Sequence, residues 1–374
     1  MAEIRVVTSS ASYPILIGDG LSSKLGLVTK RYAVSPRVFA VFDAKVFALH
    51  GQHILRSLKQ AGRPVEVFVM PSGEAHKNEK VLAGLYDFLL KSKISRTDLL
   101  LAIGGGVTTD IVGYAAATTL RGVRWSAVAT TLLGMVDAAI GGKTGINHER
   151  GKNLIGAIWQ PRFVLCDLSL LQTLPPRELV AGFGEIVKYA GLIGDPMLPL
   201  VSRLLDGDAS AKDWQVAIAR SAAYKARIVS KDEREETIRA YLNLGHTFAH
   251  AIEHSLGYGR LLHGEAVLVG LLGAVCLSML AEPSSAKRLK GYYRLLLSAV
   301  EMVPKRKLKP KDLVRAMSLD KKRVGNDHRF VLLKAPGKPY ITTGLPAAMI
   351  TFAVEQMIAD YNDFGGKHAP RTGR

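Results

Sequence analysis

The sequence predicts an α/β amino-terminal domain followed by a mostly α-helical carboxy-terminal domain. The chain has 374 residues, beyond the size at which a single hydrophobic core keeps growing. Short apolar runs alternate with helical patterns in its first half, whereas long helical patterns dominate after Pro175 and Pro176. We therefore place the domains at residues 1–175 and 176–374.

The first half of the chain alternates predicted strands and helices. Apolar runs of β type occupy residues 14–17, 37–42, 65–70 and 99–103. Between them, apolar residues recur at spacings of three and four, which predicts helices over residues 49–60 and 80–90. Such alternation is typical of a parallel sheet wrapped by helices.

Helical spacing dominates the second half, where strand signals are few. The predicted helices cover residues 177–193, 214–229, 238–254, 265–280 and 286–300. Residues 367–374 have the composition of a frayed terminal tail. We expect a mostly helical second domain.

Charge is the unusual feature of the composition. Lys and Arg number 50 against 32 Asp and Glu, which gives a net charge of +18 and an isoelectric point near 9.8. This balance suits nucleic acid, an acidic membrane or a small anionic substrate as partner. Residues 301–340 are rich in Lys and Arg, and a solvated surface is the simplest interpretation of that stretch. An apolar content of 48% excludes an intrinsically disordered chain.

Two cysteines and the amino terminus bear on location. Cys166 and Cys276 lie in apolar runs, which indicates buried free thiols and a reducing compartment. The first residues lack the apolar core of an export signal, and no stretch reaches the ~20 uninterrupted apolar residues of a membrane helix. We expect a cytoplasmic protein without a membrane partner.

A run of three glycines, residues 104–106, follows the predicted strand 99–103 and precedes a helical pattern that starts near Val107. A strand, a glycine turn and a helix amino terminus allow a pyrophosphate to meet bare backbone N–H groups at the positive end of the helix dipole. Asp43, after another predicted strand, is placed to accept a ribose hydroxyl. Packing of the glycines and capping by Asp43 are the alternative interpretations.

Residues 130–156 combine glycines and small apolar residues with ionisable side chains. Asp137, Lys143 and Lys152 lie in this block, beside Asn147 and Asn153. Ionisable groups among glycines are unusual for a solvated surface and favour a cleft that receives an anion.

Histidines cluster in the second half. His246, His250 and His254 are spaced by four, so that they would share one face of a helix, and His263 follows closely. Histidines at this spacing can chelate one metal ion, with Glu185 as an oxygen ligand from another helix. Together with the glycine turn, the cluster predicts nicotinamide redox chemistry assisted by a Lewis acid.

These residues resemble the 3-dehydroquinate synthases, a family of sugar-phosphate cyclases. The matching stretches are residues 104–110, 120–123, 130–133, 136–137, 140–145, 151–157, 160–161, 184–185, 188–189, 243–248, 250–253 and 262–267. The resemblance implies a nucleotide-binding α/β domain, a helical metal-binding domain and an active site between them. It also implies the metal ligands Glu185, His246 and His263, which replaces the set spaced by four. His250 would then face the substrate, and His254 would be structural.

The resemblance further implies the other site residues. Catalytic or substrate-binding roles fall to Arg121, Asp137, Lys143, Lys152, Asn153, Lys188, Lys225, Arg239, Asn243, His250 and Lys322. The nucleotide pocket would comprise Asp43, Glu74, Lys77, Gly105, Gly106, Val107, Asp110, Thr130, Thr131 and Thr173, with Lys143 and Lys152.

The implied cofactors are NAD and a divalent metal ion, zinc or cobalt. The implied reaction converts 3-deoxy-D-arabino-heptulosonate 7-phosphate to 3-dehydroquinate and phosphate, the second step of the shikimate route to aromatic amino acids. NAD transiently oxidises a hydroxyl, phosphate leaves by elimination, hydride returns, and an intramolecular aldol closes the ring. NAD ends as it began, so the enzyme would be a lyase.

Two departures from the family pattern keep alternatives open. Position 109 is Thr where many relatives have Gly, and Ala138 and Ala139 replace a common Ser-Ser pair. A sibling sugar-phosphate cyclase and a metal-dependent polyol dehydrogenase are the rival enzymes. Nucleic-acid binding through residues 301–340 is the rival of another class, although that stretch lacks interleaved aromatic residues. The family resemblance also implies a homodimer.

Overall fold

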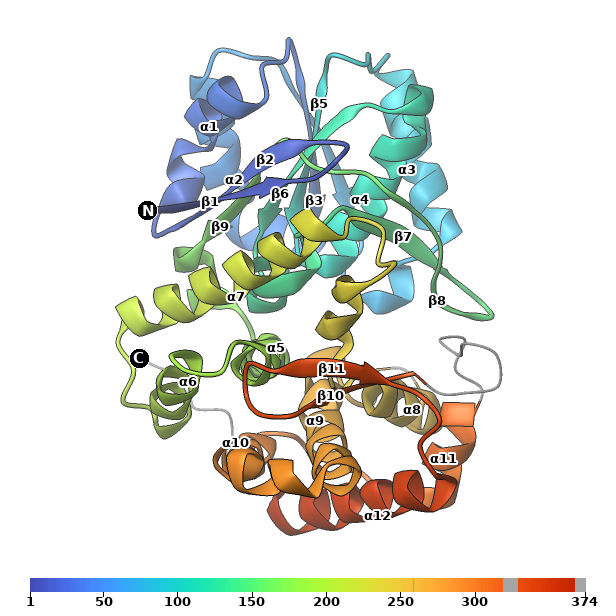
Figure 1. Cartoon of the computed structure of the whole chain (residues 1–374). Helices are drawn as coiled ribbons and strands as arrows, with labels where there is room; N and C mark the ends of the chain where they lie inside the picture. Colours follow the sequence, from blue (N-terminus) through green and yellow to red (C-terminus); the bar gives the residue numbers. More distant parts are fainter. Residues whose placement is uncertain (258, 319–328, 367–374) are drawn as a thin grey trace. The chain divides into compact units, whose positions relative to one another are not determined.

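The structure, a computed structural model, describes residues 1–257, 259–318 and 329–366 (Figure 1). It divides into two compact units. The first unit comprises Met1–Leu174 and Lys225–Arg234, and the second comprises Pro175–Tyr224 and Glu235–Arg374. The long helix α7 (Ala211–Lys231) contributes residues to both units.

The first unit is built on a seven-stranded sheet in the order β1-β2-β9-β6-β5-β3-β4. Its edge strand β1 pairs antiparallel with β2, and every other pairing is parallel. The strands are β1 (Ala2–Val7), β2 (Ser12–Gly18), β3 (Val38–Asp43), β4 (Val65–Met70), β5 (Leu99–Gly104), β6 (Arg124–Ala129) and β9 (Val164–Asp167). All six residues of β5 are buried, as expected for a central strand with both faces covered.

Helices connect the parallel strands, which confirms the predicted α/β class. They are α1 (Leu25–Tyr32), α2 (Ala44–Gln60), α3 (Glu79–Lys91) and α4 (Gly106–Thr118). Ile54 and Leu58, one turn apart on α2, are buried in one core cluster with Phe42 of β3 and Ile103 of β5. Strands β3 and β5 are neighbours in the sheet. The chain continues from β3 to β4 on one side and from β5 to β6 on the other, so the sheet has a topological switch point between β3 and β5.

A separate hairpin of β7 (Lys143–His148) and β8 (Gly151–Ile158) packs on α4. The close approach depends on Gly113 of α4, where an added Cβ would lie 2.3 Å from Thr144 Cγ2. A π-helical turn, Gly134–Ala138, precedes the hairpin. Neither feature was predicted from the sequence.

The second unit is helical, as predicted. Its helices are α5 (Pro176–Ile193), α6 (Met197–Asp206), the first part of α7, α8 (His246–Leu256), α9 (His263–Ala281), α10 (Ala286–Val300), α11 (Pro310–Ser318) and α12 (Ala347–Phe364). Helix α9 is at the centre, with α5, α8, α10 and α12 packed against it. It is the one helix of the described residues long and apolar enough to cross a membrane, but 83% of its apolar window is buried inside the protein, as in a core helix.

The structure of this unit differs from the prediction at two places. The predicted helix 238–254 is wrong as one element: Ile238–Asn243 form a 3-10 turn, and α8 starts at His246 after Gly245 adopts a left-handed φ of 78°. The hairpin of β10 (Phe330–Leu333) and β11 (Pro339–Thr342) was not predicted.

Cys166 and Cys276 are free and buried, as expected, and burial raises the pKa of both thiols.

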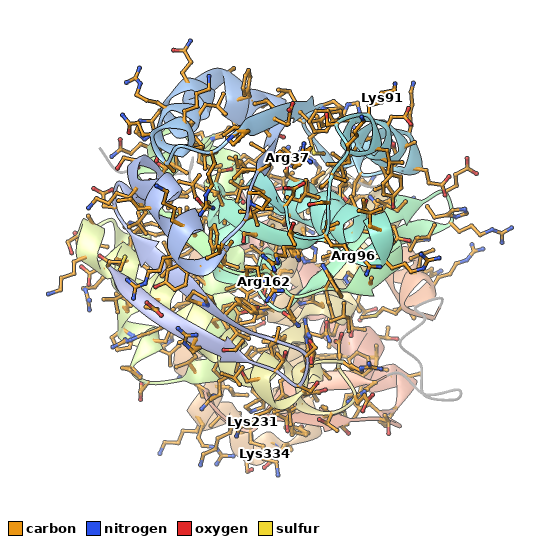
Figure 2. All side chains as sticks on the ribbon, turned by 90° about the horizontal axis from the view of Figure 1, so that it is seen from above. Arg37, Lys91, Arg96, Arg162, Lys231 and Lys334 are labelled. Atoms are coloured by element: carbon orange, nitrogen blue, oxygen red, sulfur yellow. The ribbon has the colours of Figure 1, made fainter. Side chains whose placement is uncertain are left out.

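The positive charge is distributed over many elements. Lys91 at the end of α3, Lys231 at the end of α7 and Lys334 directly after β10 are all exposed (Figure 2). In the basic stretch 301–340, the described side chains of Lys305, Lys307 and other lysines are also exposed, in agreement with a solvated surface.

Candidate functional site

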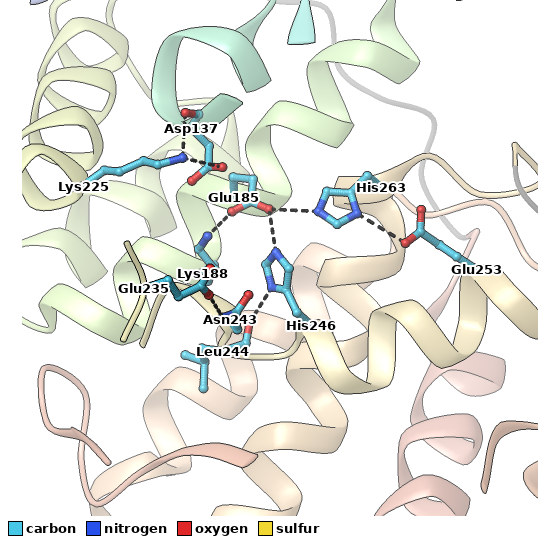
Figure 3. A network of polar contacts seen from close by, with 10 residues as sticks. All are labelled: Asp137, Glu185, Lys188, Lys225, Glu235, Asn243, Leu244, His246, Glu253 and His263. Carbon is cyan, nitrogen blue, oxygen red and sulfur yellow. Dashed lines mark hydrogen bonds and ion pairs between the residues drawn. The ribbon is translucent and has the colours of Figure 1, made fainter. Parts of the chain in front are cut away.

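Three side chains from different helices converge in the second unit (Figure 3). The Oε1 atom of Glu185 on α5 lies 3.7 Å from Nε2 of His246 and 3.7 Å from Nε2 of His263. Each of these residues offers one ligand atom, and the three atoms lie within 4.8 Å of one another. Glu185 is 1% exposed; Lys188 forms an ion pair with its Oε2, whereas Oε1 has no hydrogen bond to the described residues. One carboxylate and two imidazoles are a donor set typical of catalytic zinc.

Close contacts between helix backbones bring these ligands together. A Cβ added at Gly264 would lie 1.7 Å from the Ala181 carbonyl oxygen, and one added at Gly184 would lie 2.2 Å from the Gly264 carbonyl oxygen. Helices α5 and α9 therefore touch beside Glu185 and His263. A Cβ at Gly270 would meet the Gly245 carbonyl oxygen at 2.4 Å, which sets α9 against the start of α8, where His246 lies.

The other nitrogen of each imidazole faces an oxygen. Nδ1 of His246 lies 3.2 Å from the Leu244 carbonyl oxygen, and Nδ1 of His263 lies 3.4 Å from Oε2 of Glu253 (Figure 3). Because these oxygens accept, a neutral imidazole that donates through Nδ1 has its lone pair on Nε2, the atom that faces Glu185 and that can bind a metal ion.

The first turn of α9 is anchored by a buried acid. Glu265, which is fully buried, accepts a hydrogen bond from the Leu262 amide at 2.7 Å. Arg177 of α5 pairs with both of its carboxylate oxygens, at 2.7 and 2.8 Å. These hydrogen bonds raise the pKa of Arg177, and the fork fixes the position of the helix end that carries His263.

Other predicted residues of this unit lie near the triad in sequence or in space. Lys188, one turn after Glu185 on α5, is 1% exposed and forms an ion pair with Glu185 Oε2. The His250 ring lies 5.7 Å from that of His246 and 6.1 Å from that of His263, between ring centroids. Asn243 donates to Glu235 at 2.6 Å, and Arg239 is 2% exposed in the same 3-10 turn.

The three histidines spaced by four do not form one metal site. His254 is exposed at the end of α8 and belongs to neither group of potential ligands found among the described residues. The second such group is His250, Glu253 and His263. Glu253 was missed by sequence reasoning, although its position seven residues after His246 places it on the same face of one helix.

Predicted nucleotide contacts of the first unit gather at the carboxyl ends of its parallel strands. Asp43 ends β3, the glycine turn follows β5, and Thr130 follows β6. Parallel strands end at one edge of the sheet, and Asp43 and Gly105 flank the switch point between β3 and β5. The Thr130 hydroxyl is buried and has no hydrogen-bond partner in the described part of the chain, as expected for a group that awaits a ligand.

The glycine turn leaves no room for side chains. A Cβ at Gly105 would lie 2.9 Å from Thr131 Cγ2, and one at Gly106 would lie 3.1 Å from Ala138 Cβ. Helix α4 begins at Gly106, so Val107 is in its first turn, and the unpaired N–H groups of that turn are available to an anion.

Asp43 and Thr173 also have structural partners. Asp43 caps α2 by accepting from the Lys45 and Val46 amides at 2.9 and 3.3 Å, and the Ser72 hydroxyl also donates to it. Thr173 bonds to His50 at 2.7 Å. The capping interpretation of Asp43 is therefore correct, and it does not exclude a ribose contact.

A polar network links the hairpin β7–β8 with α4 and the loop after β4. Lys77, 4% exposed, contacts both Asp110 of α4 and Asn153 of β8. Burial raises the pKa of Asp110, and the charge of Lys77 opposes that shift. Asn147, which had no assigned role, donates to Glu74 at 2.8 Å and accepts from the Asn153 amide at 3.0 Å.

Asp137 and Lys225 are paired within the first unit (Figure 3). Lys225 Nζ lies 2.9 Å from Asp137 Oδ2 and donates to the Asp137 backbone oxygen at 2.7 Å. Asp137 lies in the π-helical turn, a feature common at functional sites. Lys143 begins β7 and is exposed, and Lys152 is half-buried on β8.

Two predicted site residues, Arg121 and Lys322, do not belong to the groups of residues described above. Arg121 is exposed in the connection that leads into the amino end of β6, away from the strand ends that carry Gly105 and Thr130. Lys322 lies outside the described residues.

Comparison with known proteins identifies the family. A model of the 3-dehydroquinate synthase N-terminal domain matches residues 67–181, and a model of the C-terminal domain of the same enzymes matches residues 182–323. The 3-dehydroquinate synthase of Rhodospirillum rubrum is 43% identical over 374 aligned residues, with 95% of each chain covered. That of Cereibacter sphaeroides is 40% identical over 366, with 95% of this chain and 98% of the relative covered.

Solved structures share the fold. A 2-deoxy-scyllo-inosose synthase complexed with carbaglucose-6-phosphate, NAD+ and Co2+ has a TM-score of 0.83 at 22% identity, with 95% of this chain and 99% of that chain covered. A 2-epi-5-epi-valiolone synthase from Streptomyces hygroscopicus with NAD+ and Zn2+ bound has a TM-score of 0.81 at 25% identity, with 93% and 97% covered. Glycerol dehydrogenase from Schizosaccharomyces pombe is less similar, with a TM-score of 0.66 at 14% identity and 100% and 97% covered. On the family models and these relatives, the chain belongs to the 3-dehydroquinate synthase family.

Proposed function

We propose that this protein is a 3-dehydroquinate synthase, which converts 3-deoxy-D-arabino-heptulosonate 7-phosphate to 3-dehydroquinate and phosphate with NAD and a divalent metal ion. The observation that carries the proposal is the convergence of Glu185, His246 and His263 in a chain about 40% identical to enzymes of that name over 95% of its length. We further propose that residues 1–175 and 176–374 are the nucleotide and metal domains.

The proposed metal ligands are Glu185, His246 and His263. The residues fit such an ion, because Oε1 of the buried Glu185 carboxylate has no hydrogen bond to the described residues and faces two imidazole nitrogens at 3.7 Å. A zinc or cobalt ion at this position would supply Lewis acidity toward a hydroxyl or carbonyl oxygen of the substrate. Lys188 and His250, beside the ligands, would contact the substrate.

The proposed NAD site is the carboxyl edge of the sheet in the first unit. The helix end at Gly106 would receive the pyrophosphate, and Asp43 the ribose. NAD supplies a reversible oxidation of one substrate hydroxyl. The contributing residues would be Asp43, Glu74, Lys77, Gly105, Gly106, Val107, Asp110, Thr130, Thr131, Lys143, Lys152 and Thr173.

The substrate is a polyanion, so its proposed partners are mostly cations. A carboxylate and a phosphate need charge-assisted hydrogen bonds, which Lys and Arg side chains donate. Asp137, paired with Lys225, would contact the reacting hydroxyl region. The other proposed contacts are Lys143, Lys152, Asn153, Lys188, Arg239, Asn243 and His250, together with Arg121 and Lys322, which are proposed from the family resemblance alone.

The proposal extends to the setting of the enzyme. We propose a cytoplasmic location and a homodimer, with no nucleic-acid or membrane partner. A sibling cyclase acting on another sugar phosphate is the second candidate, because Thr109, Ala138 and Ala139 depart from the family pattern. The Ala138 Cβ lies 3.1 Å from the position of a Cβ added at Gly106, so residue 138 adjoins the glycine turn.

The test is an assay of the purified protein with the heptulosonate phosphate, a divalent metal and NAD at a small fraction of the substrate concentration. We expect many equivalents of phosphate per NAD and no accumulation of NADH. Stoichiometric NADH would instead indicate a polyol dehydrogenase, and turnover of another sugar phosphate in preference would indicate a sibling cyclase. Glu185→Gln is the control that should lose both bound metal and phosphate release.

A further inference from the structure

We propose that Glu253 is a positioning residue of the metal site, which holds the His263 imidazole through Nδ1 so that Nε2 is presented to the ion. The inference rests on the proposed metal site, because it assigns a role toward the same three ligands. It concerns a residue that contacts a ligand rather than the substrate.

The two imidazoles are arranged in parallel ways. Both direct Nε2 at the same atom, Glu185 Oε1, at 3.7 Å. Both place Nδ1 near an oxygen acceptor: the Leu244 carbonyl for His246 and the Glu253 carboxylate for His263. An imidazole whose Nδ1 donates a proton has its lone pair on Nε2, which is the atom a metal requires.

Helix α8 supplies both a ligand and the proposed positioning residue. His246 is its first residue, and Glu253 follows two turns later on the same face. Glu253 is only 4% exposed, whereas the His263 side chain is 34% exposed. The buried carboxylate therefore restricts the rotation of the more accessible His263 ring from the protein side.

The chemical difference between the two acceptors matters. A carboxylate stabilises positive charge that moves onto the imidazole when a metal binds, and it does so more strongly than a neutral carbonyl. Glu253 would therefore strengthen the bond to His263 as well as orient the ring. Removal of such partners typically weakens metal affinity by about 10- to 100-fold.

One other arrangement uses the same atoms. His250, Glu253 and His263 also form a group of potential ligands, in which Glu253 would bind the ion directly. In that arrangement Glu185 would be dispensable for metal binding. The two arrangements are distinguished by which acid, Glu185 or Glu253, is essential.

The experiment measures Zn2+ and Co2+ affinity of the purified full chain by competition with a chromophoric chelator. The variants are Glu253→Gln, Glu185→Gln and His254→Asn, the last being a matched control at the neighbouring, exposed position of α8. We expect about 10- to 100-fold weaker binding and an altered Co2+ absorption spectrum for Glu253→Gln. Glu185→Gln should abolish binding, and His254→Asn should match the unmodified protein.

Several results would overturn the proposal. Unchanged affinity and spectrum in Glu253→Gln would show that the carboxylate does not act on His263. Metal binding that survives Glu185→Gln but not Glu253→Gln would make Glu253 a ligand. Failure of the unmodified protein to bind either ion would overturn the proposed metal site itself.

A second measurement does not depend on the folding of a variant. In the unmodified protein with Zn2+, the nitrogen resonances of His263 should report a proton on Nδ1 and metal on Nε2. Metal on Nδ1 would contradict the proposed role of Glu253.

Discussion

Single residues in this protein serve structure and chemistry together. Asp43 caps α2 through one carboxylate oxygen, Oδ1, which accepts from the Lys45 and Val46 amides, and it ends the strand beside the proposed nucleotide site. Lys225 fixes the π-helical turn through two contacts to Asp137 and is also a proposed substrate contact. Sequence motifs located both residues, but only their contacts show which atoms are already engaged.

Arg239 gives a prediction at this scale. It is 2% exposed, and its guanidinium can pair with a carboxylate through two parallel hydrogen bonds, which Lys cannot reproduce. Arg239→Lys should raise KM for the heptulosonate phosphate about 10- to 100-fold, from the loss of about 1.5–3 kcal/mol of charge-assisted hydrogen bonding. Steady-state kinetics and a separate NAD titration check it; an equal loss of NAD affinity would refute the assignment.

At the level of elements, close helix packing rather than helical periodicity brings the proposed metal ligands together. Glu185, His246 and His263 each adjoin a glycine at which two backbones meet. A spacing of four along one predicted helix suggested a different set, because periodicity describes neighbours on one helix and says nothing about α5 or α9. The family resemblance supplied the set that the structure brings together.

Gly264 tests this packing. In Gly264→Ala the new Cβ would lie 1.7 Å from a backbone oxygen, so α5 and α9 must separate. We expect a loss of more than about 1–3 kcal/mol in stability and at least about tenfold weaker metal binding. Gly291→Ala on α10 is the control: its Cβ would meet nothing within 4 Å, and Ala should stabilise the helix by about 0.5–1 kcal/mol. Equal behaviour of the two variants in denaturation and metal titration would exclude the packing argument.

The shifted pKa of Glu233 predicts that the stability of the first unit depends on pH. Burial alone would raise its pKa, but hydrogen bonds from Ser10, Ser9 and Gln160 lower it from 4.5 to about 2. Because the folded pKa is below the unfolded one, the stabilisation is complete above pH about 4.5 and is lost as pH falls toward about 2.

The variant Glu233→Gln should be less stable than the unmodified protein at neutral pH and should lose less stability between those two pH values. Urea denaturation at several pH values measures this. Parallel pH profiles for the two proteins would show that Glu233 contributes no proton-linked stability.

The whole molecule carries a net charge of +18, and the proposed substrate is an anion. Long-range attraction should accelerate their encounter, and salt should screen it as the Debye length falls from about 30 Å at 0.01 M to about 3 Å at 1 M. We expect kcat/KM to decrease steadily over this range, with kcat changing much less. An uncharged solute at matched viscosity is the control, and a kcat/KM insensitive to salt would contradict a role for the net charge.

The sequence by itself determined the α/β and helical classes, the glycine turn at residues 104–106 and, through its family motifs, the proposed metal ligands Glu185, His246 and His263. These signals are local or follow a fixed spacing, so they can be read along the chain. Only the tertiary structure showed the broken helix at Gly245, the close contacts at Gly184 and Gly264, and Glu253 behind His263. Those features depend on which backbone segments meet in space, and such contacts between distant segments cannot be inferred from any single stretch of sequence.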